Sequence, residues 1–140
     1  MSNTKPAQRI LIVDDHAGIR DVFIFHMQGQ NFIIGEAEDG VQAMALVRRL
    51  RPDLIVLDLL MPSLNGCAVL DLLQEEGYGD IPVIVMTGMD EAFDKDAILR
   101  QPNVVDYLIK PFSYDGLAKR IRNFIAKGVP AAPLTDQTCR

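Results

Sequence analysis

Short apolar runs recur along this chain, and a polar residue closes each of them at its carboxyl end. Four runs stand out, at residues 9–13, 53–57, 81–86 and 104–109, and the residues that close them are Asp14, Asp58, Thr87 and Lys110. Apolar runs of this length, bounded by turn-forming residues, are typical of buried strands. Because such strands are apolar on both sides, their sheet must be covered on both faces.

Segments with apolar residues at helical spacing alternate with these runs. We expect a further strand at residues 32–36, and helices at about 17–27, between Gly40 and Pro52, and at about 66–75, 91–100 and 114–126. Repeated β-α units favour a parallel sheet with helices on both faces. The predicted fold is a doubly wound α/β fold with a five-stranded parallel sheet in the order 2-1-3-4-5, the flavodoxin-like arrangement.

The polar residues that close the strands are expected to meet, because the carboxyl ends of parallel strands share one edge of the sheet. Asp14, Asp15 and Asp58 would bring three carboxylates together. Two carboxylates ~4 Å apart repel by about 4 kcal/mol at an effective dielectric constant of 20, so the group needs a counterion. Carboxylates with waters suit Mg²⁺, while Lys110 and Thr87 offer a positive charge and a hydroxyl to a phosphoryl group.

Asp58 is the candidate nucleophile at this edge, since it stands alone at its strand end and a carboxylate can form an aspartyl-phosphate. Each aspartate taken alone could instead cap a helix. The complete set, in order and always at a strand end, favours the chemical interpretation over helix capping.

The ordered set of motifs resembles the response-regulator receiver domain of two-component signalling, over about residues 8–125. The matching residues are Asp14-Asp15, Asp58 followed by Met61-Pro62 and Gly66, Thr87-Gly88, Tyr107, and Lys110-Pro111-Phe112. Each fragment is a weak signal by itself, whereas the ordered set is specific. We therefore expect a receiver domain at residues 8–126 and a disordered tail or linker at residues 127–140.

The resemblance implies a phosphoacceptor rather than an enzyme with a separate substrate. Asp58 would accept a phosphoryl group from a phosphohistidine on a sensor histidine kinase or a histidine phosphotransfer protein. The domain would catalyse only its own phosphorylation and slow dephosphorylation. Asp15 and Asp58 would bind Mg²⁺ directly, with Asp14 nearby and the backbone carbonyl of Leu60 as a further ligand.

The resemblance also implies how phosphorylation is transmitted. Thr87 and Lys110 would hold the phosphoryl oxygens, and Tyr107 would be the aromatic switch residue that turns inward when Thr87 moves. The face formed by the fourth helix, the fifth strand and the fifth helix would then change shape for an output protein, a fused effector or a second copy in a homodimer. The Lys110–Pro111 peptide bond is expected to be cis, which proline makes energetically accessible.

The net charge of −5 and the pI of about 4.9 narrow the range of partners. An acidic chain lacks the basic surface that nucleic acids require, so we expect no direct nucleic-acid binding. We also expect a cytoplasmic protein with no membrane insertion, because no apolar stretch reaches the ~18 residues of a membrane span and residues 1–8 are too polar for a signal peptide. Cys67 and Cys139 form no metal-binding pair and are expected to be free. With no room for an effector domain after the last helix, the chain is either a stand-alone receiver or part of a longer regulator.

Three further features of the sequence lead to expectations of their own. Leu60 and Met89 occupy positions that in the family influence how water reaches the aspartyl-phosphate, and neither can orient a water, so we expect slow self-dephosphorylation. Asn103 stands where the family often has glycine, and because asparagine tolerates the left-handed conformation that a helix end needs, we expect the fold to be unharmed. In the apolar run Phe23-Ile24-Phe25, either Ile24 or Phe25 should be exposed and could dock the histidine-bearing partner.

Two other classes of function stay open from the sequence alone. A haloacid-dehalogenase-like phosphatase also uses an aspartate nucleophile with Mg²⁺, but it needs a second acid two residues later, where this chain has Leu60. The other class is a binding module that no longer takes a phosphoryl group, against which the intact acidic set and Lys110 argue.

Overall fold

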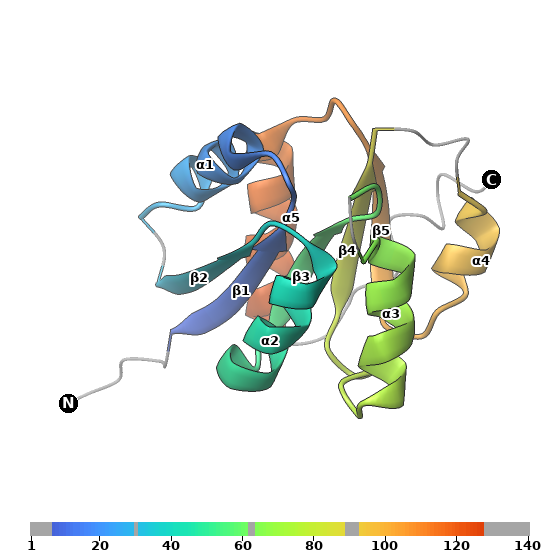
Figure 1. Ribbon diagram of the computed structural model, residues 1–140. Coiled ribbons are helices and arrows are strands. Elements are labelled where there is room, and N and C mark those ends of the chain that lie inside the picture. Colours follow the sequence, from blue (N-terminus) through green and yellow to red (C-terminus); the bar gives the residue numbers. More distant parts are fainter. Residues whose placement is uncertain (1–6, 30, 62–63, 89–92, 128–140) are drawn as a thin grey trace.

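The computed structural model describes residues 7–29, 31–61, 64–88 and 93–127. Strands and helices alternate in this part of the chain: β1 (Gln8–Val13), α1 (Ala17–His26), β2 (Phe32–Ala37), α2 (Gly40–Leu50), β3 (Leu54–Asp58), α3 (Gly66–Glu75), β4 (Val83–Thr87), α4 (Lys95–Leu99), β5 (Val104–Ile109) and α5 (Tyr114–Lys127). The strands are all parallel and stand in the order β2-β1-β3-β4-β5 (Figure 1). The predicted flavodoxin-like fold is confirmed.

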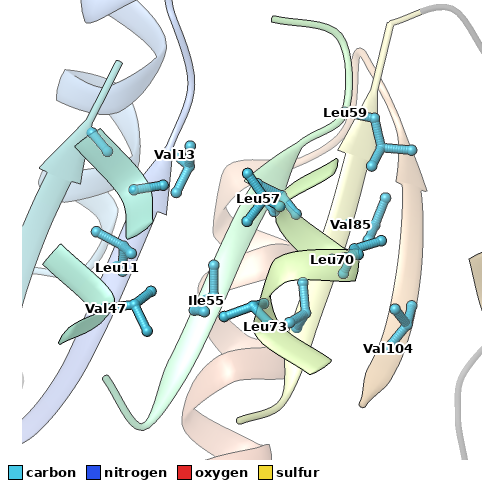
Figure 2. Packing of buried hydrophobic residues seen from close by; sticks show 14 of the residues in the cluster. Leu11, Val13, Val47, Ile55, Leu57, Leu59, Leu70, Leu73, Val85 and Val104 are labelled. Atoms are coloured by element: carbon cyan, nitrogen blue, oxygen red, sulfur yellow. The ribbon is translucent and has the colours of Figure 1, made fainter. Parts of the chain in front are cut away.

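Successive residues of the central strands point to opposite faces of the sheet and build two apolar cores. On one face, Leu11 of β1 and Ile55 of β3 belong to a core that α2 and α3 cover (Figure 2). On the other face, Ile10 and Leu54 pack with residues of α1 and α5. Because β3 and β4 are buried on both faces, their sequences are continuous apolar runs rather than alternating ones.

Side-chain caps fix where several of the helices begin, among them α2, α3 and α4. Asp39, Asn65 and Asp94 each accept a hydrogen bond from the backbone N–H three residues later, at 2.8, 3.0 and 3.1 Å respectively. Such caps satisfy N–H groups that the first helical turn leaves without an intrahelical partner. The cap at Asp94 starts α4 at Lys95, so the described helix is shorter than the one expected from about residue 91. Residues 89–92 lie outside the described residues.

Asn103 does not use the left-handed conformation that asparagine tolerates. Among the described non-glycine residues a positive φ occurs at Arg51 and not at Asn103. Asn103 is 5% exposed, and its amide donates to the carbonyl of Ile81 at 3.0 Å and accepts from Gln74 Nε2 at 3.0 Å. Buried amides need such partners. Asn103 therefore ties the loop before β5 to the loop before β4 and to α3.

Other expectations are met or lie outside the described residues. Phe25 is 67% exposed, the Lys110–Pro111 peptide bond is cis, and Cys67 is a free, partly buried thiol. Within the described part of the chain, no helix is both long and apolar enough to cross a membrane. Met89, Cys139 and residues 128–140 of the expected tail lie outside the described residues, so the domain boundary at residue 126 stays a prediction.

Candidate functional site

The structure brings the predicted polar residues to one edge of the sheet. Asp58 and Thr87 are the last residues of β3 and β4, and Asp14 and Lys110 directly follow β1 and β5. Asp14 and Thr87 are fully buried and Asp58 is 3% exposed. Two carboxylates therefore lie in a largely dry crevice, where an ionised group needs partners.

Asp14 is held by backbone and side-chain contacts on three sides. Its N–H donates to the carbonyl of Ala37 at 3.0 Å, which continues the pairing of β1 with β2. Its Oδ1 accepts the backbone N–H of His16 at 2.9 Å, and its carbonyl accepts Arg20 Nη1 at 2.6 Å. Arg20 is further fixed by Glu36, whose Oε1 accepts its Nε at 2.9 Å. The carboxylate of Asp14 is therefore placed by the fold rather than by solvent.

Lys110 supplies the positive charge between the two buried carboxylates. Its Nζ donates to Asp14 Oδ2 at 2.7 Å and lies 3.5 Å from Asp58 Oδ2. Its backbone N–H donates to the carbonyl of Thr87 at 2.8 Å, which fixes the start of its side chain beside the end of β4. Burial lowers the pKa of Lys110, but the hydrogen bond to Asp14 and the charges of Asp58 and Asp14 together raise that pKa above its usual value. The ammonium stays charged.

Asp58 is the less neutralised of the two carboxylates. The pKa of Asp58 is raised from 3.8 to about 6, mainly by burial and further by the charge of Asp14, although Lys110 opposes both. The backbone N–H of Leu60 donates to Asp58 Oδ1 at 3.2 Å, a long hydrogen bond. Lys110 and the N–H of Leu60 thus favour the charged form of Asp58 only in part. A carboxylate in this state gains from any further positive charge at the site.

Asp15 and His16 extend the site toward solvent. The Oδ1 atom of Asp15 is buried and has no hydrogen-bond partner, although His16 Nδ1 lies 3.2 Å away. One ligand atom from each of Asp14, Asp15 and His16 can be chosen so that all lie within 4.8 Å of one another. An unpaired buried oxygen beside further oxygen donors is the environment that a hard divalent cation stabilises. The residues present therefore fit Mg²⁺.

Gly66 supports the loop that follows Asp58. Its N–H donates to the carbonyl of Leu59 at 3.0 Å. A Cβ atom at this position would lie 2.6 Å from Leu59 Cα and 2.7 Å from the carbonyl oxygen of Asp58, both backbone atoms. Any other residue would push this backbone aside, so a glycine is required for the α3 N-terminus to approach Asp58 so closely.

Tyr107 lies inward on β5, next to the strand that ends in Thr87. It is 6% exposed, and it pairs in register with Val85, two positions before Thr87. Lys95 Nζ, from the first residue of α4, lies 5.2 Å from the centre of the Tyr107 ring. A cation over an aromatic face at this distance contributes a favourable interaction. The predicted switch residue is thus in contact with both β4 and α4.

The structure adds two residues that the motifs did not reveal as part of this neighbourhood, Arg20 and Lys95. It also places His16, which the sequence puts at the border of the crevice, in direct contact with the carboxylates. Arg20 and Lys95 belong to helices whose positions relative to the strand ends depend on packing. The sequence signal that could have placed Arg20 near the site is its position in the first turn of the predicted helix that follows Asp14.

A cavity of about 530 Å³ lies at the opposite edge of the sheet, near the start of β3 and the end of α5. Among the described residues, its lining includes the carboxylates of Asp53 and Asp80 but no basic or nucleophilic side chain. The Asp53 carboxylate accepts the backbone N–H of Arg9 at 2.8 Å. The converging charges lie at the other edge of the sheet, and we place the functional site there.

Comparison with known proteins shows the family of the chain. The sequence matches the model of a family described as the response regulator receiver domain over residues 10–122. It is 36% identical over 115 residues to the DNA-binding response regulator MtrA of Mycolicibacterium paratuberculosis, covering 82% of this chain and 50% of MtrA. It is 37% identical over 122 residues to the response regulator MprA of Mycobacterium leprae, covering 87% of this chain and 53% of MprA.

Solved structures agree with the fold. The receiver domain of the Francisella response regulator 1452 is similar with a TM-score of 0.75 at 28% identity, over 86% of this chain and 98% of that domain. The chain spans about half the length of the curated relatives that it matches.

Proposed function

Because this chain belongs to the response regulator receiver domain family, we propose that Asp58 is the residue that accepts the phosphoryl group. Receiver domains of two-component systems characteristically act as phosphoacceptors, and they are generally not classical enzymes. The phosphatase alternative therefore loses its support. We further propose that the domain catalyses only its own phosphorylation and slow dephosphorylation.

The observation that carries this proposal is that Lys110 neutralises the two buried carboxylates unequally. Lys110 donates at 2.7 Å to Asp14 but lies 3.5 Å from Asp58, and burial leaves Asp58 with a pKa of about 6. Lys110 therefore neutralises Asp14 better than Asp58, so Asp58 gains more from additional positive charge at the site. It also ends β3 between the two neighbouring strands, within reach of Lys110.

The proposed transfer uses Asp58 as the nucleophile. A carboxylate oxygen of Asp58 attacks the phosphorus of a phosphohistidine, and the new O–P bond forms as the P–N bond breaks. The electron pair of that bond returns to the imidazole of the donor, which takes up a proton from solvent. The modified Asp58 then carries a charge of about −1.5 to −2 in place of its single negative charge.

We propose that Asp15 and Asp58 hold Mg²⁺ directly, with Asp14 nearby and the carbonyl of Leu60 as a further ligand. The buried, unpartnered Oδ1 of Asp15 supports this assignment. When bound, Mg²⁺ supplies positive charge that offsets the repulsion between the carboxylates and the incoming phosphoryl oxygens. Lys110 holds the remaining phosphoryl oxygens from the side of β5, and Thr87 does so with its hydroxyl.

The proposed switch follows from the position of Lys110 and Thr87 at the ends of β5 and β4. A phosphoryl group on Asp58 draws Lys110 away from Asp14 and draws Thr87 toward the new oxygens. Tyr107 is buried next to β4 and under Lys95, so it is placed to transmit this movement to α4. The face of α4, β5 and α5 would then present its altered shape to a partner.

Response regulators work with histidine kinases, and we propose a sensor histidine kinase or a histidine phosphotransfer protein as the phosphoryl donor. The output partner of this chain is a separate protein, a fused effector or a second copy in a homodimer. The relative MtrA is named as DNA-binding, but this chain matches only half of its length. On the basis of the acidic composition, we propose that residues 8–126 do not themselves bind nucleic acid, and that the protein acts in the cytoplasm.

Titration with beryllofluoride, a phosphoryl mimic, in the presence of Mg²⁺ tests this proposal. Amide NMR shifts of β4, β5 and α4 should saturate in the wild type and stay unchanged in Asp58→Asn. Asp53→Asn is the matched control, because Asp53 precedes the same strand at its opposite end. It should respond like the wild type. A full response in Asp58→Asn, or none in the wild type, would overturn the assignment of Asp58.

A further inference from the structure

His16 is placed unlike an ordinary surface histidine. Its side chain is 68% exposed, yet its Nδ1 lies 3.2 Å from Asp15 Oδ1 and 3.3 Å from Asp14 Oδ1. It precedes α1 at the N-cap position but makes no side-chain capping hydrogen bond. Both its backbone N–H, at 2.9 Å, and its ring Nδ1, at 3.3 Å, lie within hydrogen-bond distance of Asp14 Oδ1. The position of the imidazole is therefore defined by the two carboxylates.

The distance between His16 Nδ1 and Asp15 Oδ1, the oxygen of a proposed direct ligand, is close to that between neighbouring ligands of one metal ion. With metal–ligand bonds of ~2.1 Å, adjacent ligands of an octahedral ion lie about 3.0 Å apart. The distance from His16 Nδ1 to Asp15 Oδ1 exceeds this value by a few tenths of an ångström. The Oδ1 of Asp15, the atom nearer to His16, is the buried oxygen that has no hydrogen-bond partner. Nitrogen and oxygen donors thus converge on one point.

We propose that His16 Nδ1 is a direct ligand of the divalent cation at this site, and that it shifts the preference of the site toward borderline ions such as Co²⁺, Ni²⁺ and Zn²⁺. Imidazole nitrogen suits these ions, whereas Mg²⁺ prefers oxygen ligands. This inference rests on the proposed function insofar as that function places a metal at Asp15 and Asp58. It adds a ligand and an ion specificity that depend on this chain's own residue 16.

His26 provides an internal control, because the chain has two histidines. His26 Nδ1 lies 2.9 Å from the carbonyl of Val22, and its ring centre lies 6.1 Å from that of Tyr114. It sits at the end of α1, whereas His16 sits just before its start. A metal effect that comes from the site should follow His16 and not His26.

The test measures Mg²⁺ and Co²⁺ affinities by calorimetry for the untagged full chain and for His16→Ala, His16→Asn and His26→Ala. Asparagine at position 16 keeps a good N-cap residue while removing the ring, so it separates ligation from helix capping. Both His16 variants should bind Co²⁺ at least about tenfold more weakly than the wild type. Their Mg²⁺ affinity should change by less than about threefold. His26→Ala should match the wild type for both ions.

Proton NMR of the Co²⁺-loaded protein supplies a direct readout of ligation. A coordinated imidazole should give a strongly shifted, solvent-exchangeable N–H signal in the wild type and in His26→Ala, and this signal should be absent from both His16 variants. Unchanged Co²⁺ affinity in the His16 variants, or equal losses for both ions, would overturn His16 as a ligand. The beryllofluoride response of the wild type in Mg²⁺ would still stand as the separate test of Asp58. A wild type that binds neither ion would overturn the metal site itself.

Discussion

Lys110 and Asp14 stand 96 positions apart in the sequence and form a buried ion pair, in which Lys110 Nζ donates to Asp14 Oδ2 at 2.7 Å. The same ammonium lies 3.5 Å from Asp58. Hydrogen bonds weaken at such lengths, so the stronger partner of Lys110 is Asp14. A phosphoryl group on Asp58 would therefore draw a cation that is already inside the crevice, over a short distance.

Replacing Lys110 by methionine should destabilise the metal-free domain, because it removes the charge between two buried carboxylates and keeps most of the side-chain volume. Breaking a buried ion pair in this way costs about 3 kcal/mol. We expect a loss of this order in the free energy of unfolding, measured by urea denaturation at pH 7.5 with EDTA present.

Lys119→Met is the matched control for Lys110→Met. Lys119 also pairs with an aspartate, Asp115, at 3.3 Å, but the two side chains are 71% and 63% exposed. Exposed pairs contribute little to stability because water screens them. The control should unfold close to the wild-type midpoint, and equal losses in the two variants would show that burial at Lys110 is not the decisive factor.

Asp58→Asn should stabilise the metal-free domain at pH 8. The pKa of Asp58 is about 6 in the folded domain against an ordinary 3.8, so the folded state binds more protons than the unfolded chain between these pH values. Stability therefore falls as the pH rises from about 4 to about 6, and the loss stays constant above that window. The pKa difference corresponds to roughly 2–3 kcal/mol, which asparagine would avoid.

The pH dependence of this variant gives the check. Unfolding free energies of the wild type and Asp58→Asn should differ by that amount at pH 8 in EDTA, and the difference should vanish near pH 4. Saturating Mg²⁺ should stabilise the wild type more than the variant, since the cation binds the ionised carboxylate. A wild type that is the more stable protein at pH 8 without metal would contradict the raised pKa.

Asn103→Gly discriminates between the expectation from sequence and the observed geometry. If the position required a left-handed backbone, glycine would be neutral or stabilising. In the structure, the substitution instead leaves the carbonyl of Ile81 and the amide of Gln74 without their partner at 3.0 Å. We expect a loss of about 1–3 kcal/mol in thermal or urea unfolding. A gain in stability would restore the left-handed interpretation.

Leu60→Asn should shorten the lifetime of the phosphorylated protein. Leu60 is 45% exposed, and its N–H donates to Asp58, so a polar side chain at this position could orient a water beside the acyl phosphate. We expect hydrolysis of the aspartyl-phosphate to accelerate by at least about threefold, a small effect beside those of well-positioned catalytic groups. The lifetime is measured from the decay of the phosphorylated protein after removal of the donor, monitored by phosphate-affinity electrophoresis. A wild-type lifetime of only seconds would contradict the slow dephosphorylation expected from this apolar residue.

The sheet and its functional edge could be predicted from the sequence because both depend on one-dimensional patterns. Buried parallel strands are continuous apolar runs, and each run ends at the residue that enters the site, as at Asp58 and Thr87. The order of strands follows from chain handedness and short connections. These rules place Asp14 beside Asp58 without any knowledge of side-chain packing.

The remaining details depend on how helices and loops pack, which the linear pattern does not encode. Asn103 reads as a helix-ending residue from its sequence neighbours, but its partners come from the loop before β4 and from α3. Lys95 meets the Tyr107 ring only because α4 packs beside β5. His16 likewise faces two carboxylates because the turn after β1 folds back on itself.

The central claim is that Asp58 accepts a phosphoryl group, and peptide mass spectrometry tests it most directly. The untagged protein is incubated with a small phosphodonor, such as acetyl phosphate, and Mg²⁺, and the acyl phosphate is trapped by borohydride reduction before digestion. We predict a single modified residue, Asp58, with the modification lost in Asp58→Asn and retained in Asp53→Asn. Modification of another residue, or an unmodified Asp58 under conditions where beryllofluoride binds, would contradict the assignment.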